Sequence, residues 1–101
     1  MFYICKRCYI KTISNLDHQC LICNNNDNYY PYKTDYDNFK NPISKITGFN
    51  CYTLSEVKNN NINYYLSSNN FFEKCDFSCL ECESESNFCK VCNSNYYNIY
   101  Q

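Results

Sequence analysis

Residues 75–92 read CDFSCLECESESNFCKVC, and this stretch decides the fold because it holds half of the cysteines of the chain. Two CxxC pairs lie inside it, Cys79 with Cys82 and Cys89 with Cys92. A segment this dense in cysteine has few side chains left for an apolar core. Cross-links through sulfur, either disulfides or a metal, must therefore hold it together.

The beginning of the chain repeats the pattern, with Cys5-x2-Cys8 followed by Cys20-x2-Cys23. Both copies continue with Cys-Asn-x-Asn and then a Tyr-Tyr pair. When the copies are aligned on their first CxxC, Met1 takes the place of Cys75. We therefore expect the first copy to begin inside its own module, as in a segment of a longer repeat array.

The composition supports a cross-linked rather than an aliphatic core. The 101 residues include ten Cys, eighteen Asn and twelve Tyr, but only sixteen Ile, Leu, Val and Met, and neither Ala nor Trp. This is the cysteine density of small disulfide scaffolds. We expect Tyr and Phe to pack over the cross-links, and we attribute the asparagine-rich character to compositional bias.

Charge and hydropathy bear on the classes of partner. The formal net charge is −1 and there is no polybasic run, which argues against binding of nucleic acid. No apolar stretch approaches the roughly 18 residues that cross a bilayer, so we expect no membrane insertion by this segment.

The predicted organisation is a partial cysteine-rich repeat at 1–30, a polar linker at 31–50 and a second cysteine-rich repeat with a hairpin at 51–101. Pro31 and Pro42 break regular structure in the linker, so we predict that it contains no helix. The predicted fold class is small, disulfide-rich and loop-dominated with short β-hairpins, arranged as elongated tandem modules. The elements expected are strands at 63–66 and 71–73 around a polar turn, a strand at 9–13 and a helical turn at 53–58.

Paired CxxC motifs also suit a tetrahedral zinc site, and an intracellular zinc-binding interaction module is the alternative prediction. Three features count against it. Only six residues separate the pairs of the second copy, Cys51 and Cys75 would have no metal partner, and the single His18 lies outside the shared pattern. Disulfides use all ten cysteines, so we favour them and predict no metal and no cofactor.

Other candidate sites are weaker. Catalysis by a cysteine with His18 is formally conceivable, but we interpret this histidine as a surface residue and predict that the protein is not an enzyme. The Tyr pairs, including Tyr29-Tyr30 and Tyr64-Tyr65, resemble stacking platforms, yet packing over disulfides explains them better. The acidic run of Glu81, Glu83 and Glu85 is interpreted as a solvated loop, because no spaced calcium-binding loop is present.

Residues 75–97, with C-x3-C-x2-C, then C-x2-C and a Tyr-Tyr exit, resemble the furin-like, growth-factor-receptor type cysteine-rich repeat of protozoan surface proteins, the cysteine repeat modular type. In this chain Asn95 stands where that repeat usually has Gly. The resemblance implies a non-enzymatic module of a cell-surface or secreted protein, acting as a structural spacer or as an adhesion or receptor surface. An unknown protein or glycan ligand and an extracellular or cell-surface location are implied with it.

The sequence leaves the disulfide connectivity open. In interleaved modules the first cysteine of one CxxC pairs with the first of the next, because a bridge within one CxxC strains the chain. On that basis we expect the pairs Cys5–Cys20, Cys8–Cys23, Cys79–Cys89 and Cys82–Cys92, with Cys51–Cys75 as the remainder.

Overall fold

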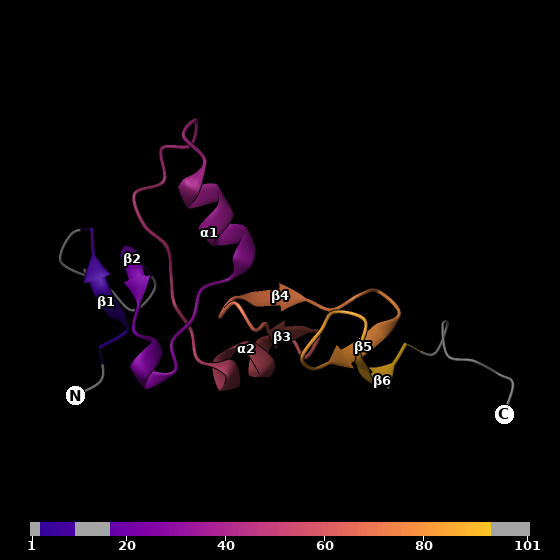
Figure 1. Ribbon diagram of the computed structural model, residues 1–101. Coiled ribbons are helices and arrows are strands. Elements are labelled where there is room, and N and C mark those ends of the chain that lie inside the picture. The colour runs from indigo at the N-terminus through magenta and orange to yellow at the C-terminus, as the bar shows by residue number, and fades with distance from the viewer. Residues whose placement is uncertain (1–2, 10–16, 94–101) are drawn as a thin grey trace, which may run out of the picture. The chain divides into compact units, whose positions relative to one another are not determined.

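The computed structural model describes residues 3–9 and 17–93, and they form a small, loop-rich, disulfide-rich fold with short antiparallel hairpins and two short helices (Figure 1). The chain divides into two compact units, Met1–Leu54 and Ser55–Gln101. The boundary differs from the predicted one, because residues 31–50 and Cys51 are part of the first unit rather than a linker and the start of a second repeat.

The first unit is built on a hairpin of β1 (Cys5–Cys8) and β2 (Cys20–Cys23), which pair antiparallel. A 3-10 turn, η1 (Asn25–Asp27), follows β2, and Asn28 closes it in the left-handed conformation. The chain then passes through helix α1 (Lys33–Lys40) and returns to the hairpin, where Phe49 forms an isolated bridge with Cys20. The returning segment is therefore an added short strand beside β2.

Helix α1 contradicts the expectation that residues 31–50 contain no helix. Pro31 precedes the N-cap Tyr32, and Pro42 follows the C-cap Asn41, so the two prolines bound the helix instead of breaking it. Lys33 and Asp37, four residues apart, form an ion pair at 2.7 Å on the exposed side.

Aromatic packing holds α1 on the first unit. The rings of Tyr36 and Phe39 meet the ring of Phe49 edge to face, with centroid distances of 5.7 and 5.1 Å. Phe49 is buried together with Cys20, Cys23 and Cys51, and these four residues are the centre of the first core. The core thus consists of sulfur and aromatic rings, as the shortage of aliphatic residues predicted.

The second unit starts with helix α2 (Leu54–Asn60) and continues with the hairpin of β3 (Tyr64–Leu66) and β4 (Phe72–Lys74). These elements agree with the predicted helical turn at 53–58 and the predicted aromatic hairpin. Asn70, with φ of 67°, turns the chain between the strands. The expected strand at 9–13 lies outside the described residues except for Tyr9, which is not in a strand.

A last hairpin joins β5 (Cys79–Cys82) to β6 (Cys89–Cys92). The core of the second unit includes a cluster of Tyr65, Cys75, Cys79 and Cys82, and Cys89 packs against this cluster. Val57 and Phe72, each 1% exposed, are also buried in the second unit, so its core combines disulfide sulfur with aromatic and aliphatic side chains.

Candidate functional site

Four disulfides join eight cysteines in the described part of the chain, and all of them lie within one unit or the other. In the first unit Cys5 is bonded to Cys20 and Cys23 to Cys51. In the second unit the bonded pairs are Cys75–Cys82 and Cys79–Cys89. Cys8 and Cys92 are not part of these four disulfides.

Two of the five expected pairs, Cys5–Cys20 and Cys79–Cys89, are pairs in the structure, and the other three differ. Cys23 is bonded to Cys51 instead of Cys8. Cys82 is bonded to Cys75 instead of Cys92, so the expected pair Cys51–Cys75 does not form either.

The reason is the way each CxxC hairpin curls. In β1–β2, Cys5 lies opposite Cys23 and Cys8 opposite Cys20, with irregular register between them. The curl brings one diagonal together, so that the Cα atoms of Cys5 and Cys20 are 5.3 Å apart. The other diagonal does not close in either hairpin, because Cys23 is bonded to Cys51 and Cys82 is bonded to Cys75.

The two CxxC hairpins have the same local structure. The β5–β6 hairpin closes the same diagonal, Cys79 to Cys89, with Cα atoms 5.1 Å apart, and its register irregularities fall at the same places. The asparagine after the last cysteine also makes the same two contacts in each copy. Asn24 donates its backbone N–H at 3.0 Å and its Nδ2 at 2.8 Å to two carbonyls just before β1, and Asn93 does the same before β5 at 2.9 and 3.2 Å. The acceptors are Ile4, Tyr3, Ser78 and Phe77 in that order.

The shared Cys-Asn exit noticed in the sequence therefore corresponds to a structural element, an asparagine clamp that closes the open end of each hairpin. The Asn93 clamp is the point where the described part ends, so the predicted exit turn at Asn95 and the pair Tyr96-Tyr97 lie outside the described residues.

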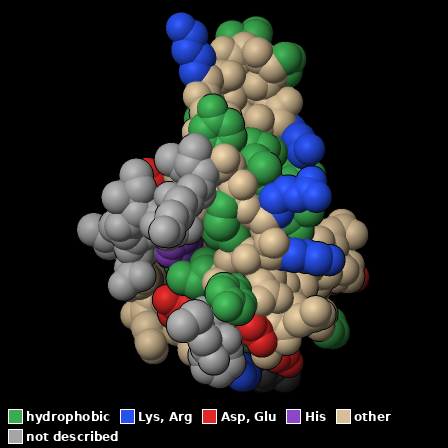
Figure 2. Space-filling model, turned by 90° about the vertical axis from the view of Figure 1, so that its left-hand side faces the viewer, with side chains coloured by type: hydrophobic (Ala, Val, Ile, Leu, Met, Phe, Trp, Pro, Cys, Tyr) green, Lys and Arg blue, Asp and Glu red, His purple; other side chains and the backbone are tan. Residues whose placement is uncertain are grey.

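His18 is buried, with only 4% of its surface exposed, which corrects its interpretation as a surface residue. In Figure 2 the histidine is a small purple area between its neighbours. Its Nδ1 accepts the backbone N–H of Cys51 at 3.1 Å, and its own backbone N–H donates to Oδ1 of Asn50 at 2.8 Å. The imidazole thus positions the segment that carries Cys51.

A cavity of about 240 Å³ in the first unit is bordered by polar groups. Burial raises the pKa of the Asp35 carboxyl above its ordinary value. A second carboxylate and two amides also line the cavity, and the only glycine of the chain forms part of its wall. The lining residues are Asp17, Asp35, Asn38, Ile46, Gly48, Phe49 and Asn50.

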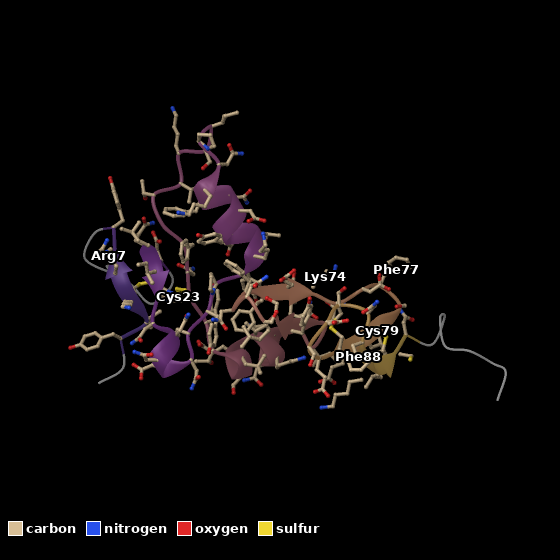
Figure 3. All side chains as sticks on the ribbon, viewed as in Figure 1. Arg7, Cys23, Lys74, Phe77, Cys79 and Phe88 are labelled. Carbon is tan, nitrogen blue, oxygen red and sulfur yellow. A yellow bond between two sulfur atoms is a disulfide. The ribbon has the colours of Figure 1, made fainter. Side chains whose placement is uncertain are left out.

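A depression of about 480 Å³ in the second unit is more apolar. Phe77 and Leu80 border it and are 68% and 45% exposed, beside the polar groups of Lys74, Asp76 and Asn93. Figure 3 shows Phe77 near Cys79, on the outside of the unit. An exposed aromatic ring next to convergent polar groups is the arrangement that ligand surfaces favour.

The Asp76 carboxylate of this depression is held by local hydrogen bonds. It accepts from the hydroxyl of Ser78 and from the Ser78 backbone N–H, the latter at 3.1 Å. These two bonds lower the pKa of Asp76 below its ordinary value, since they favour the charged form. Asp76 therefore presents a negative charge beside the exposed Phe77 ring.

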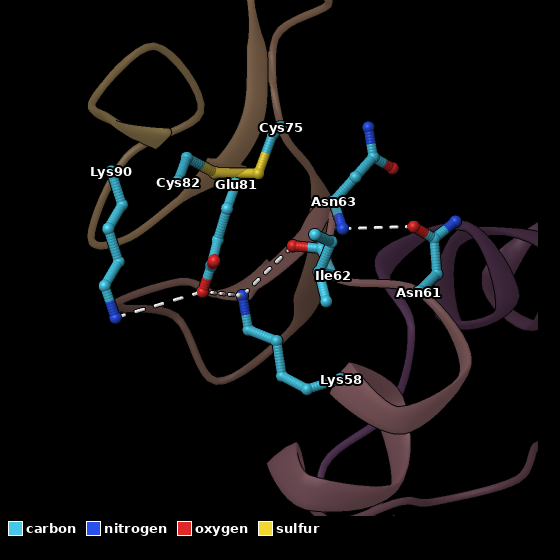
Figure 4. A network of polar contacts seen from close by, with 8 residues as sticks. All are labelled: Lys58, Asn61, Ile62, Asn63, Cys75, Glu81, Cys82 and Lys90. Carbon is cyan, nitrogen blue, oxygen red and sulfur yellow. Dashed lines mark hydrogen bonds and ion pairs between the residues drawn. A yellow bond between two sulfur atoms is a disulfide. The ribbon is translucent and has the colours of Figure 1, made fainter. Parts of the chain in front are cut away.

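The acidic run near β5 is partly neutralised. Glu81 lies 3.7 Å from Nζ of Lys58 and 3.9 Å from Nζ of Lys90, and Lys58 also donates to the carbonyl of Ile62 at 3.2 Å (Figure 4). Glu83 and Glu85 are exposed. This geometry agrees with the interpretation of the run as a solvated loop with one ion-paired member.

The bonded cysteines argue against the zinc alternative, because a sulfur in a disulfide cannot be a thiolate ligand. Within residues 3–9 and 17–93, no three His, Cys, Asp or Glu side chains form a group that could hold a metal ion. No helix in the same ranges has the length and apolar character needed to cross a bilayer.

The fold and the sulfur framework define the chain as a small disulfide-rich protein, a class typical of extracellular proteins. No protein-family model, curated protein or solved structure matches it.

Proposed function

We propose that the chain is a non-enzymatic module of a secreted or cell-surface protein, acting as a structural spacer or as an adhesion or receptor surface. The observation that carries this proposal is that disulfide sulfur lies buried in both cores, with Cys20, Cys51, Cys79 and Cys82 at most 2% exposed. Such cores require an oxidising compartment, since cytosolic thiol systems would reduce them.

The relation to furin-like, growth-factor-receptor type cysteine-rich repeats is part of the same proposal. It is supported by the cysteine spacing of residues 75–92 and by the occurrence of two CxxC hairpins with the same register, the same closed diagonal and the same asparagine clamp. A protein built from repeats of one hairpin is expected to show this internal likeness.

The adhesion role is assigned to the depression of the second unit. Phe77 and Leu80 supply exposed apolar surface, and Lys74 and Asp76 supply one charge of each sign beside it. This suits a protein or glycan ligand, for which an aromatic face and a few polar groups give contact area and orientation.

Thiol counting on the secreted full-length chain tests the proposal. Alkylation without reduction should modify no more than two cysteines, and alkylation after reduction should modify ten. The circular dichroism signal should collapse with dithiothreitol and persist with EDTA. Ten reactive thiols before reduction, with bound zinc and collapse in EDTA, would overturn the proposal in favour of the intracellular zinc module.

A further inference from the structure

The two CxxC hairpins are alike inside but differ in what covers their second strand. In the first unit the cysteines of β2, Cys20 and Cys23, are 0% and 5% exposed. In the second unit the corresponding cysteines of β6, Cys89 and Cys92, are half-buried and exposed. The same strand is thus a core element in one copy and a surface element in the other.

The cover of β2 is a short extended segment that ends in a cysteine. Phe49 exchanges two backbone hydrogen bonds with Cys20, at 2.8 and 3.0 Å, on the outer edge of the strand. Two residues later, Cys51 is bonded to Cys23. The intervening Asn50 points back to the backbone of His18, and the Phe49 ring fills the core. An aromatic-x-cysteine segment therefore completes this hairpin with backbone pairing and one disulfide.

In the second unit the corresponding edge of β6 has no such cover among residues 3–9 and 17–93. β6 is the outer strand of a two-stranded sheet, and the isolated bridges in these ranges involve other residues. Phe88, which directly precedes β6, is 66% exposed (Figure 3). Val91, within β6, is 44% exposed. Phe88 has the position in its hairpin that Gln19 has in the first hairpin. The backbone carbonyl of each accepts the N–H of the residue that follows the first strand, Glu83 for Phe88 and Tyr9 for Gln19.

Cys92, at the end of this edge, has the same position in its hairpin as the disulfide-bonded Cys23 has in the first hairpin. Cys92 and Cys23 are both the last residue of their strand, both lie opposite the first cysteine of the hairpin, and both precede the clamping asparagine. Cys23 is bonded to Cys51, whereas Cys92 is an exposed thiol. The diagonal partner of Cys92 in this hairpin would be Cys82, which is already bonded to Cys75.

We infer that the β6 edge is a docking site for an extended aromatic-x-cysteine segment of a partner polypeptide, which pairs with the backbone of Cys89 and forms a disulfide with Cys92. The aromatic side chain of the partner would lie against the apolar surface beside β6, as Phe49 does beside β2. Addition of a strand to an open edge is a common mode of peptide recognition.

The covalent step needs an oxidant, and oxidised glutathione supplies it. The Cys92 thiolate attacks oxidised glutathione, which forms a mixed disulfide and releases one glutathione thiolate. The partner thiolate then attacks the Cys92 sulfur and displaces the second glutathione. In sum two thiols lose two electrons and two protons, and one oxidised glutathione becomes two reduced glutathiones. This step rests on the proposed function only in requiring an oxidising compartment.

The chain itself supplies the probe. A synthetic peptide with the sequence of residues 46–53, ITGFNCYT, carries the segment that covers β2. The matched control peptide has Phe49→Ser and keeps the cysteine and the charge. Each is incubated with the full-length chain in a buffer of reduced and oxidised glutathione, and the attachment site is mapped by mass spectrometry. Attachment at Cys23, by displacement of Cys51, is counted separately.

We expect the phenylalanine peptide to label Cys92 at least about fivefold more than the serine peptide, and Cys92→Ser to abolish this labelling. Equal labelling by both peptides would overturn the inference, because Cys92 would then be only an exposed thiol. A Cys92–Cys92 dimer as the main product would also overturn it, in favour of a second copy as the occupant. The four internal disulfides are mapped in the same samples, so a failure of the proposed function is detected independently of the labelling ratio.

Discussion

The Cys23–Cys51 disulfide offers the sharpest test of the structure, because it ties residues 31–50 to the first hairpin. Replacing both cysteines, as Cys23→Ala with Cys51→Ala, removes the bond without leaving a new thiol. The bond closes a separation of 28 residues, the longest of the four disulfides, whereas Cys75–Cys82 closes 7. The corresponding double variant of Cys75 and Cys82 is the matched control.

The chain-entropy relation predicts a cost of about 3.6 kcal/mol for loss of the longer loop and about 2.4 kcal/mol for the shorter one. A small domain has roughly 5–15 kcal/mol of total stability, so the first loss brings the unit close to its limit. Phe49 and the rings of Tyr36 and Phe39 should become exposed at the same time, since the segment that holds them is no longer anchored.

Urea denaturation followed by two-dimensional NMR separates the two units, because each amide reports its own unit. Amides of Met1–Leu54 should show the loss, and amides of Ser55–Gln101 should keep their midpoint. Equal effects of the two double variants, or an unchanged first unit, would refute the reasoning. Peptide mapping of the native chain that found Cys8–Cys23 and Cys51–Cys75 would refute the connectivity itself.

Three further predictions use the same denaturation assay. His18→Leu should lower the stability of the first unit by about 1–3 kcal/mol, because the buried N–H of Cys51 loses its acceptor. His18→Asn should retain most of that stability, because its Oδ1 can replace Nδ1 as the acceptor. Equal losses in the two variants would contradict the role of Nδ1. Gly48→Ala should destabilise the first unit by about 1–3 kcal/mol, because a Cβ would lie 2.7 Å from the backbone carbon of Gln19, and a neutral effect would show that the close approach is absent. Partial desolvation raises the pKa of Asp35, so its protonation favours the folded state and stability should rise as the pH falls through that raised value. Asp35→Asn should stabilise the unit at pH 7 and remove this pH dependence, whereas the control Asp37→Asn, at a carboxylate paired with Lys33, should not.

Residue patterns over a few positions predicted the elements that are stabilised by interactions between residues close together in the sequence. The aromatic runs around Ser67–Asn70 predicted the β3–β4 hairpin, because side-chain alternation and turn residues act over a few positions. The repeated Cys-Asn exit identified two equivalent segments, and the structure shows that each is a CxxC hairpin. The scarcity of aliphatic residues predicted the sulfur and aromatic cores for the same reason, since composition bounds what a core can contain.

The features that the sequence analysis missed depend on tertiary contacts. Helix α1 is short and polar, and its stability comes from Tyr36 and Phe39 packed on Phe49, a contact ten or more positions away in the chain. The disulfide partners of Cys23 and Cys82 are Cys51 and Cys75, which lie outside the CxxC pairs, and cysteine spacing does not encode these partners. The burial of His18 likewise depends on Cys51, which lies 33 residues further on.

The order in which the disulfides can form follows from the opposite directions in which the two hairpins are completed. In the second unit Cys75 precedes the hairpin, so its partner Cys82 is available as soon as it leaves the ribosome or translocation pore. Cys23 must wait for Cys51, and 28 residues take about 1–6 seconds to synthesise at typical rates. During that delay Cys23 could form a premature bond with a cysteine that emerged earlier, and such a bond would be the first trap. Correcting such a bond is slow without catalysis, so production of the first unit should depend on a disulfide isomerase, whereas the second unit should mature without one.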